Sequence, residues 1–190
     1  MTATTPKQTQ LSLEAFLEQP ETKPAREYIN GKVYQKPMPQ GKHSTLQLEL
    51  ASAINQVGKP QKLAYAFPEL RCTFGGRSLV PDIAVFEWKN IPREASGKVA
   101  DRFNTPPDWT IEILSPKQSP NRVIREIAFC LQQGTKLGWF LDPSDESITV
   151  FQPNKTPEFK ESSDILPILS ILGDWQLTVV EVFSWLSFEL

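Results

Sequence analysis

The chain has 190 residues and a formal net charge of −2, with 39% hydrophobic and 22% charged residues. These values are typical of an ordinary globular protein of one domain. They exclude a strongly basic protein that coats nucleic acid, although they leave room for a local basic cleft. Residues 1–10 are polar and predict a disordered tail, and we expect a single domain over residues 11–190.

The N-terminal stretch lacks the apolar core of a signal peptide, and no run reaches the roughly 18 apolar residues of a membrane span. Cys72 and Cys130 lie in apolar runs without the spacing of a metal site, so we interpret them as buried free thiols of a reducing compartment. We therefore expect a cytoplasmic protein that has no membrane partner.

The first half of the chain predicts short helices and hairpins. Ser12 is a good N-cap for a short helix. Two turn pairs typical of hairpins follow: Asn30-Gly31 and Gly75-Gly76. Between them, apolar residues at helical spacing predict a long helix over about residues 43–57.

The second half predicts a strand, a helix and a strand. The segments in order are a long polar loop at 89–107, a central strand at 109–114, a helix from Pro120 to about residue 133 that Ser119 caps, strands at 138–141 and 148–152, and a closing helix at about 179–186. This pattern is typical of an α/β fold in which a central mixed β-sheet is flanked by helices. The long loop is either functional or a solvated connection without a role.

Two strand-like runs each carry a carboxylate that periodicity does not explain. Asp82 begins one run and Glu112 lies within the other. A charged side chain in an apolar strand is costly unless it is paired or binds a metal. On neighbouring strands the two could converge on one Mg²⁺, which polarises a phosphodiester and lowers the pKa of a bound water. The structural alternative is a buried couple held by hydrogen bonds or a salt bridge.

Further motifs follow in a fixed order. They are Pro81-Asp82, Glu112-Ile113-Leu114-Ser115-Pro116, Gly134 and Gly138-Trp139-Phe140-Leu141-Asp142-Pro143, with Glu27-Tyr28-Ile29-Asn30-Gly31 and His43 upstream. This set resembles the bacterial Uma family of predicted endonucleases, which has the restriction-endonuclease-like PD-(D/E)XK fold, and the resemblance covers about residues 12–186. It implies a phosphodiesterase that depends on Mg²⁺, with Mn²⁺ as the alternative ion. Its metal and catalytic residues would be Asp82 and Glu112, and its substrate a nucleic acid, expected to be DNA.

The chain departs from this family in one respect, the missing lysine. PD-(D/E)XK nucleases carry a lysine two residues after the glutamate, and Uma-like sequences carry it on the following helix, but these positions are Leu114 and Glu126 here. Arg122 and Lys117 are the candidate catalytic replacements, although a guanidinium is a poor proton acceptor. Alternatively, Arg122 and Glu126 form an i, i+4 surface pair. The missing lysine supports a second hypothesis, a catalytically weakened endonuclease-like binding or assembly protein.

Other residues have more than one interpretation. His43 is the only histidine; the resemblance places it near the cleft as a substrate-binding residue, and otherwise it bonds a backbone group. Glu27 is either a further metal-binding carboxylate or an ordinary charge at a strand end. A two-carboxylate glycosidase is disfavoured because no sugar-stacking cluster accompanies the pair. The apolar segments 168–172 and 183–188 could form the surface of a homodimer.

Overall fold

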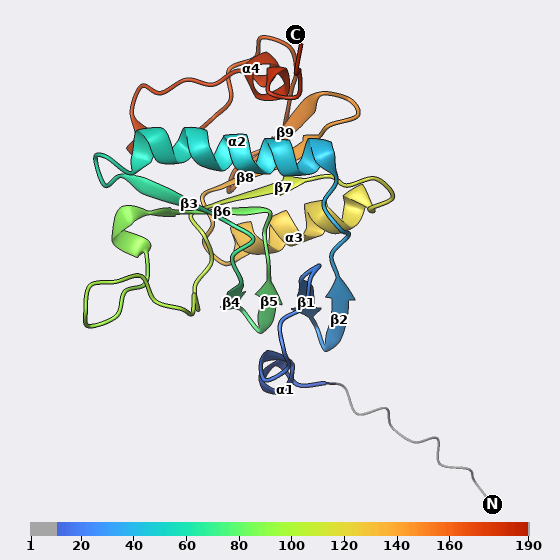
Figure 1. The fold of residues 1–190 in the computed structure, drawn as a ribbon, viewed down its shortest axis with the longest axis vertical. Coiled ribbons are helices and arrows are strands. Elements are labelled where there is room, and N and C mark those ends of the chain that lie inside the picture. The colour runs from blue at the N-terminus through green and yellow to red at the C-terminus, as the bar shows by residue number, and fades with distance from the viewer. Residues whose placement is uncertain (1–10, 190) are drawn as a thin grey trace, which may run out of the picture.

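A large six-stranded sheet forms the centre of the fold in the computed structural model, which describes residues 11–189 (Figure 1). The expected disordered tail at residues 1–10 lies outside the described residues. The strand order is β10-β9-β8-β7-β6-β3. The strands are β3 (Ala64–Pro68), β6 (Ile83–Glu87), β7 (Trp109–Ile113), β8 (Leu137–Asp142), β9 (Ser147–Phe151) and β10 (Glu158–Lys160). Strands β7 and β8 are parallel and the other neighbours antiparallel, so the predicted mixed sheet is confirmed.

Helices cover both faces of this sheet, as Figure 1 shows. Helix α2 (Gly41–Gly58) lies on one face and α3 (Pro120–Gln132) on the other. Trp109, Ile111 and Ile113 of β7 belong to the α2-side core, which contains Leu46, Leu50 and Ile54. A smaller core under α3 joins Val123 and Ile127 to Phe140. The side chains of β7 therefore alternate: Trp109, Ile111 and Ile113 enter the α2-side core, and the buried polar residues Thr110 and Glu112 lie on the opposite side.

A second, four-stranded sheet has the order β2-β1-β5-β4. Its strands are β1 (Arg26–Ile29), β2 (Lys32–Gln35), β4 (Cys72–Phe74) and β5 (Arg77–Leu79). The two hairpins within it match the predicted turn pairs. The two hairpins join into one sheet because Tyr28 of β1 pairs with Ser78 of β5. The sequence did not predict this pairing, since the two residues are far apart in the chain and no local pattern encodes the contact. This sheet brings the end of β2 toward the large sheet.

The remaining elements are short. Helix α1 (Leu13–Leu17) begins after Ser12, whose Oγ accepts a hydrogen bond from the Ala15 amide at 3.1 Å, as its N-cap role predicts. The closing helix α4 (Val179–Ser184) ends two residues before the predicted limit. Two 3₁₀ turns, η1 (Trp88–Asn90) and η2 (Ser170–Leu172), complete the described elements.

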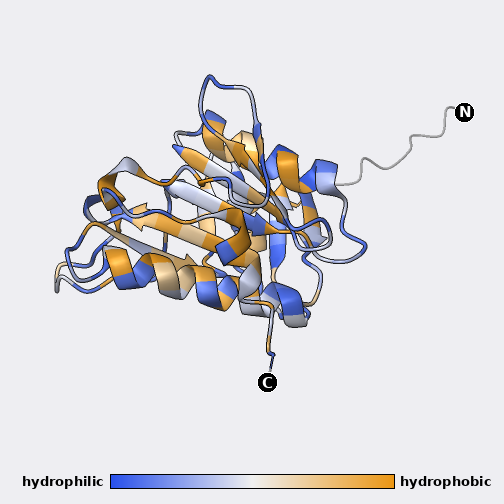
Figure 2. Cartoon of the chain, turned by 90° about the horizontal axis from the view of Figure 1, so that it is seen from above, coloured by the Kyte–Doolittle hydropathy of each residue, from blue (hydrophilic) through white to orange (hydrophobic). Residues whose placement is uncertain are grey.

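Gly138 allows α3 to pack closely against β8. A Cβ atom at this position would collide with Cγ2 of Ile127 on α3. The close approach holds α3, and with it Arg122 and Glu126, against the sheet. In Figure 2 the hydrophobic residues lie mainly along the central strands and on the helices, whereas many loops are hydrophilic. Cys72 and Cys130 are buried free thiols, as predicted. Each helix within residues 11–189 is too short or too polar to traverse a bilayer.

Candidate active site

Asp82 is held beside the central strand β7 by strand pairing and by hydrogen bonds to its carboxylate and its carbonyl. It immediately precedes β6, which pairs with β7 through Ile83 and Ile111. Its Oδ2 atom accepts a hydrogen bond from the amide of Ile113 at 2.7 Å. Its own carbonyl accepts one from Nε2 of Gln47 on α2 at 2.7 Å. The carboxylate is therefore held beside the strand that carries Glu112.

Glu112 lies within β7 and is buried, as the pattern of the strand predicts. Alternation places it on the same side as Leu114, which packs on the small core of Val123 and Ile127 under α3. Leu114 is thus a partly buried side chain packed on this core, which gives a physical reason for an apolar residue where the resemblance implies a lysine.

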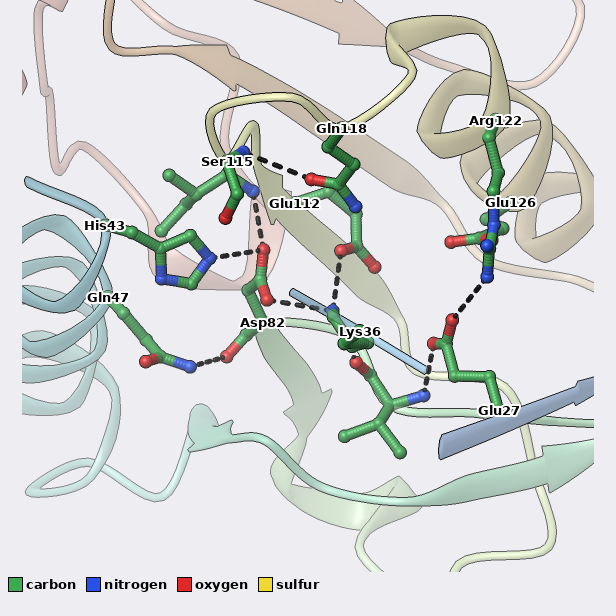
Figure 3. A network of polar contacts seen from close by, with 12 residues as sticks. Glu27, Lys36, His43, Gln47, Asp82, Glu112, Ser115, Gln118, Arg122 and Glu126 are labelled. Carbon is green, nitrogen blue, oxygen red and sulfur yellow. Dashed lines mark hydrogen bonds and ion pairs between the residues drawn. The ribbon is translucent and has the colours of Figure 1, made fainter. Parts of the chain in front are cut away.

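A lysine that the sequence analysis did not single out bridges the two carboxylates. Lys36 follows β2 directly, and its Nζ atom lies 2.8 Å from Oδ1 of Asp82 and 3.2 Å from Oε2 of Glu112 (Figure 3). Nζ also donates a hydrogen bond to the carbonyl of Val80 at 2.8 Å. An ammonium has three donors, so these three acceptors satisfy it. The chain supplies a lysine to the site from a distant strand instead of from position 114 or 126.

His43 contributes a further polar contact to Asp82. It lies in the first turn of α2, and its Nε2 atom is 3.1 Å from Oδ2 of Asp82. Its Nδ1 atom is buried and has no hydrogen-bond partner among residues 11–189. The structure therefore brings His43 to the site, where the resemblance places it.

A second acidic cluster adjoins the first, as Figure 3 shows. Oε1 of Glu27 accepts a hydrogen bond from the Val80 amide at 2.9 Å, and its Oε2 lies 3.5 Å from the guanidinium of Arg122. Nε of Arg122 donates to Oε1 of Glu126 at 2.9 Å, and the guanidinium lies 4.0 Å above the ring of Tyr34. The expected i, i+4 pair is present, but the Glu126 carboxyl is buried and not at the surface.

Burial and charge set the protonation of the first cluster. Burial lowers the pKa of Lys36, but the carboxylates of Asp82, Glu112 and Glu27 outweigh this and hold it well above its ordinary value, so the ammonium stays charged. Burial raises the pKa of Asp82, but Lys36 and His43 outweigh burial and hold it well below the usual range.

The pKa values of Glu112 and Glu126 shift in the opposite direction. Burial raises the pKa of Glu112, with added repulsion from Asp82, Glu126 and Glu27 that the Lys36 ammonium does not cancel. Burial and the charge of Glu27 raise the pKa of Glu126 to about 7, against the pull of Arg122. One carboxylate of the central pair is thus firmly ionised and the other retains a proton more easily.

Some of the predicted site residues meet in the structure and others lie apart. Asp82, Glu112 and His43 converge, and Glu27 and Arg122 form the adjoining cluster. Arg122 contacts Glu27 and Glu126 and forms no ion pair with Glu112 within the described residues. Lys117 is exposed, with a left-handed backbone (φ 68°) and no ion pair to either carboxylate in the described part of the chain. Lys36 was missed because a lysine at the end of an exposed hairpin strand looks like ordinary surface charge.

The donor set fits a hard divalent cation. Within residues 11–189 no three His, Cys, Asp or Glu side chains are arranged to hold a metal, but Mg²⁺ is usually held by one or two carboxylates, with waters and substrate phosphates as the other ligands. Two carboxylates already converge on one cationic group. The joined clusters place four carboxyl groups against two permanent cations, namely Glu27, Asp82, Glu112 and Glu126 against Lys36 and Arg122. When Glu112 and Glu126 lose their protons, the joined clusters carry two more negative charges than positive ones, and a dication would offset that excess.

Comparisons with known proteins agree with this fold. The model of the Uma2 family, described as "Putative restriction endonuclease", matches residues 13–180. A crystal structure described as "a putative nuclease belonging to DUF820", from Anabaena variabilis ATCC 29413, is 50% identical to this chain, covers 93% of it and 99% of its own length, and superposes with a TM-score of 0.91. A search of curated proteins finds no match. The chain therefore belongs to the Uma2 family and has the restriction-endonuclease-like fold.

Proposed function

We propose that this protein is a Mg²⁺-dependent endonuclease that hydrolyses phosphodiester bonds in nucleic acid, with DNA as the expected substrate. The observation that supports this most strongly is the convergence of Asp82 and Glu112, two buried carboxylates from neighbouring strands, on one cation position. Membership of a family whose printed description is "Putative restriction endonuclease" supports the same reaction.

Each residue of the site has a proposed part. Asp82 and Glu112 would hold Mg²⁺, or Mn²⁺ in its place; the ion would polarise the phosphodiester and lower the pKa of water. Hydrogen bonds from Ile113 and His43 fix the orientation of the Asp82 carboxylate. The unpartnered Nδ1 of His43 is the group we assign to substrate binding.

The adjoining cluster has a different part. Glu27 is tied to a backbone amide and to Arg122, so we propose that it shapes the charge of the site, with a direct metal contact as the alternative. Arg122, which is held between Glu27 and Glu126, keeps its proposed catalytic part as a positive charge for phosphate. Lys117, at the surface of the loop after β7, is proposed as a contact to substrate outside the pocket.

The test is a cleavage assay on plasmid, single-stranded DNA and RNA, with Mg²⁺ and with Mn²⁺. Glu112→Gln is the sharpest variant because it keeps the shape of the side chain and removes its charge. We expect the wild type to cut and Glu112→Gln to lose at least about a hundredfold in rate, which is the scale of losing one electrostatic group. Equal cutting by the wild type and Glu112→Gln would refute the assignment, because it would indicate a contaminating nuclease.

A catalytically weakened binding or assembly protein is the second candidate. It is favoured by the small size of the pocket beside Asp82, Lys36 and His43, about 10 Å³, which holds about one water. This protein would bind nucleic acid without cutting it under any metal condition. A binding measurement run beside the cleavage assay therefore separates the two candidates.

The expected homodimer stays a prediction. In the two segments named for it, Ile171 is 40% exposed and Phe188 80% exposed. A duplex presents two strands related by a two-fold axis, which a symmetric dimer can match. Sedimentation of the wild type against Phe188→Ser tests it: a dimer that this substitution weakens is the expected result, and a monomer at all concentrations contradicts it.

A further inference from the structure

The Lys36 ammonium occupies the position where a cation between Asp82 and Glu112 would sit. It is within 2.8 Å of one carboxylate and 3.2 Å of the other, and its side chain is only 12% exposed. Among the residues that the structure describes, it is the lysine that forms ion pairs with both groups. The carboxylates therefore already have a cationic partner that belongs to the protein.

The pocket leaves no room for a phosphate beside this lysine. Its volume is about 10 Å³, which is enough for about one water and too little for a phosphate group. A phosphate would therefore fit beside Lys36 and Asp82 only after a rearrangement of the residues that line this pocket.

Lys36 is the group that can leave the position with the least disturbance of the fold, although its ammonium must give up contacts to Asp82, Glu112 and the Val80 carbonyl. Asp82 is held by the Ile113 amide and by His43, and Glu112 lies in the middle of a buried strand. Lys36 instead lies just outside the end of β2, ahead of Pro37, and carries its charge on four rotatable methylenes. A shift of its side chain alone would open the cation position without disturbing either sheet.

We propose that the Lys36 ammonium is an internal counter-ion that fills the cation position between Asp82 and Glu112, and that it leaves this position when a divalent cation binds. Once released, it remains beside the site as a positive charge that can face the substrate phosphate. This inference rests on the proposed function for its metal and its phosphate. In this proposal Lys36, which follows β2, takes the role of the lysine that is missing from positions 114 and 126.

The test is a titration with Mn²⁺ alone at pH 8, in which free Mn²⁺ is followed by electron paramagnetic resonance. Lys36→Met removes the charge, and Lys36→Gln removes it while keeping a hydrogen-bond donor, in case the first variant does not fold. Lys32→Met is the matched control, because Lys32 is exposed on β2, the strand that Lys36 follows. We expect both Lys36 variants to bind Mn²⁺ at least tenfold more tightly than the wild type, and the control to bind as the wild type does.

The possible results separate this inference from the proposed function. If the wild type binds Mn²⁺ and the Lys36 variants bind equally or more weakly, the counter-ion role is refuted and the metal-dependent function stands. If only the Lys36 variants bind, Lys36 does fill the cation position, but its release by a divalent cation is refuted and the wild type is not a metal-dependent nuclease. If none of them binds, both proposals are refuted. A cleavage assay adds a second readout, because tighter metal binding with slower cutting is a combination that a purely structural lysine would not produce.

Discussion

The Nζ atom of Lys36 lies 3.2 Å from Oε2 of Glu112, although the two residues are 76 positions apart in the sequence. One belongs to the end of a strand in the small sheet and the other to the middle of the large sheet. The contact therefore joins the two sheets at the candidate site. It also gives this chain a lysine at the carboxylates in spite of Leu114 and Glu126.

Removing Lys36 and placing a lysine at position 126 tests whether Lys36 does the work of the lysine that Uma-like sequences carry there. We expect Lys36→Met to lower the rate of cleavage by about a hundredfold or more, since it removes a positive charge from the site. Adding Glu126→Lys returns a lysine at the position where Uma-like sequences carry it, and should recover at least tenfold of the rate. Arg125→Lys in the same background is the control, because Arg125 is exposed on the same helix. Recovery by Arg125→Lys as well would show that the position does not matter.

The raised pKa of Glu126 predicts how the stability of the protein depends on pH. Its pKa rises from an ordinary value of 4.5 to about 7 because the side chain is buried and lies near Glu27. Between these values the folded state keeps a proton that the unfolded state releases, so the contribution of Glu126 to stability falls as pH rises, by about 3 kcal/mol at most. Glu126→Gln does not titrate, and its amide oxygen can still accept from Arg122. Its free energy of unfolding, relative to the wild type, should therefore rise between pH 4.5 and pH 8.

Chemical denaturation of both proteins at several pH values measures this difference. Metal must be absent, because a bound cation would lower the same pKa. A difference that stays constant from pH 4.5 to pH 8 would contradict the assigned pKa.

Asp82 and Glu112 should differ in their effect on stability. Asp82 accepts hydrogen bonds or ion pairs from Ile113, His43 and Lys36. Removing one partner of a buried ion pair typically costs about 3–5 kcal/mol. Asp82→Ala should therefore lower the free energy of unfolding by that amount, whereas Glu112→Gln should cost less, because it also removes a carboxyl group of raised pKa. Thermal and denaturant unfolding decide this, and equal stability of Asp82→Ala and the wild type would argue against the described network.

Even a methyl group at position 138 should lower the stability of the protein. A Cβ there would meet Cγ2 of Ile127, so Gly138→Ala should destabilise the protein by about 1–3 kcal/mol through overpacking. Gly41→Ala is the control, since a Cβ at Gly41 has no heavy atom within 4 Å. Similar stability of both variants would show that the contact between α3 and β8 is looser than described.

Local patterns in the sequence predict much of the fold. Ser12, the two glycine turn pairs and the periodicity of the long helix each encode an element through contacts within a few residues, and each is present. The alternation of β7 also predicts that Glu112 is buried on the side of Leu114. These features depend on short-range geometry, which a sequence displays directly.

The rest depends on contacts between distant segments. The pairing of Tyr28 with Ser78 builds the small sheet, and that sheet delivers Lys36 to Asp82. No periodicity in residues 32–36 marks the lysine as buried, because its neighbours in the strand are mostly exposed. The sequence thus predicts the carboxylates, which stand out in apolar runs, and misses the cation that pairs with them.

The most direct measurement is a crystal structure of the wild type soaked in Mn²⁺, read by anomalous scattering. The metal-site proposal predicts one anomalous peak between Asp82 and Glu112, about 2.1 Å from a carboxylate oxygen of each. The counter-ion proposal predicts that the Lys36 ammonium has then moved away from both carboxylates. No peak at saturating Mn²⁺, with Lys36 still bridging Asp82 and Glu112, would contradict the metal-dependent nuclease.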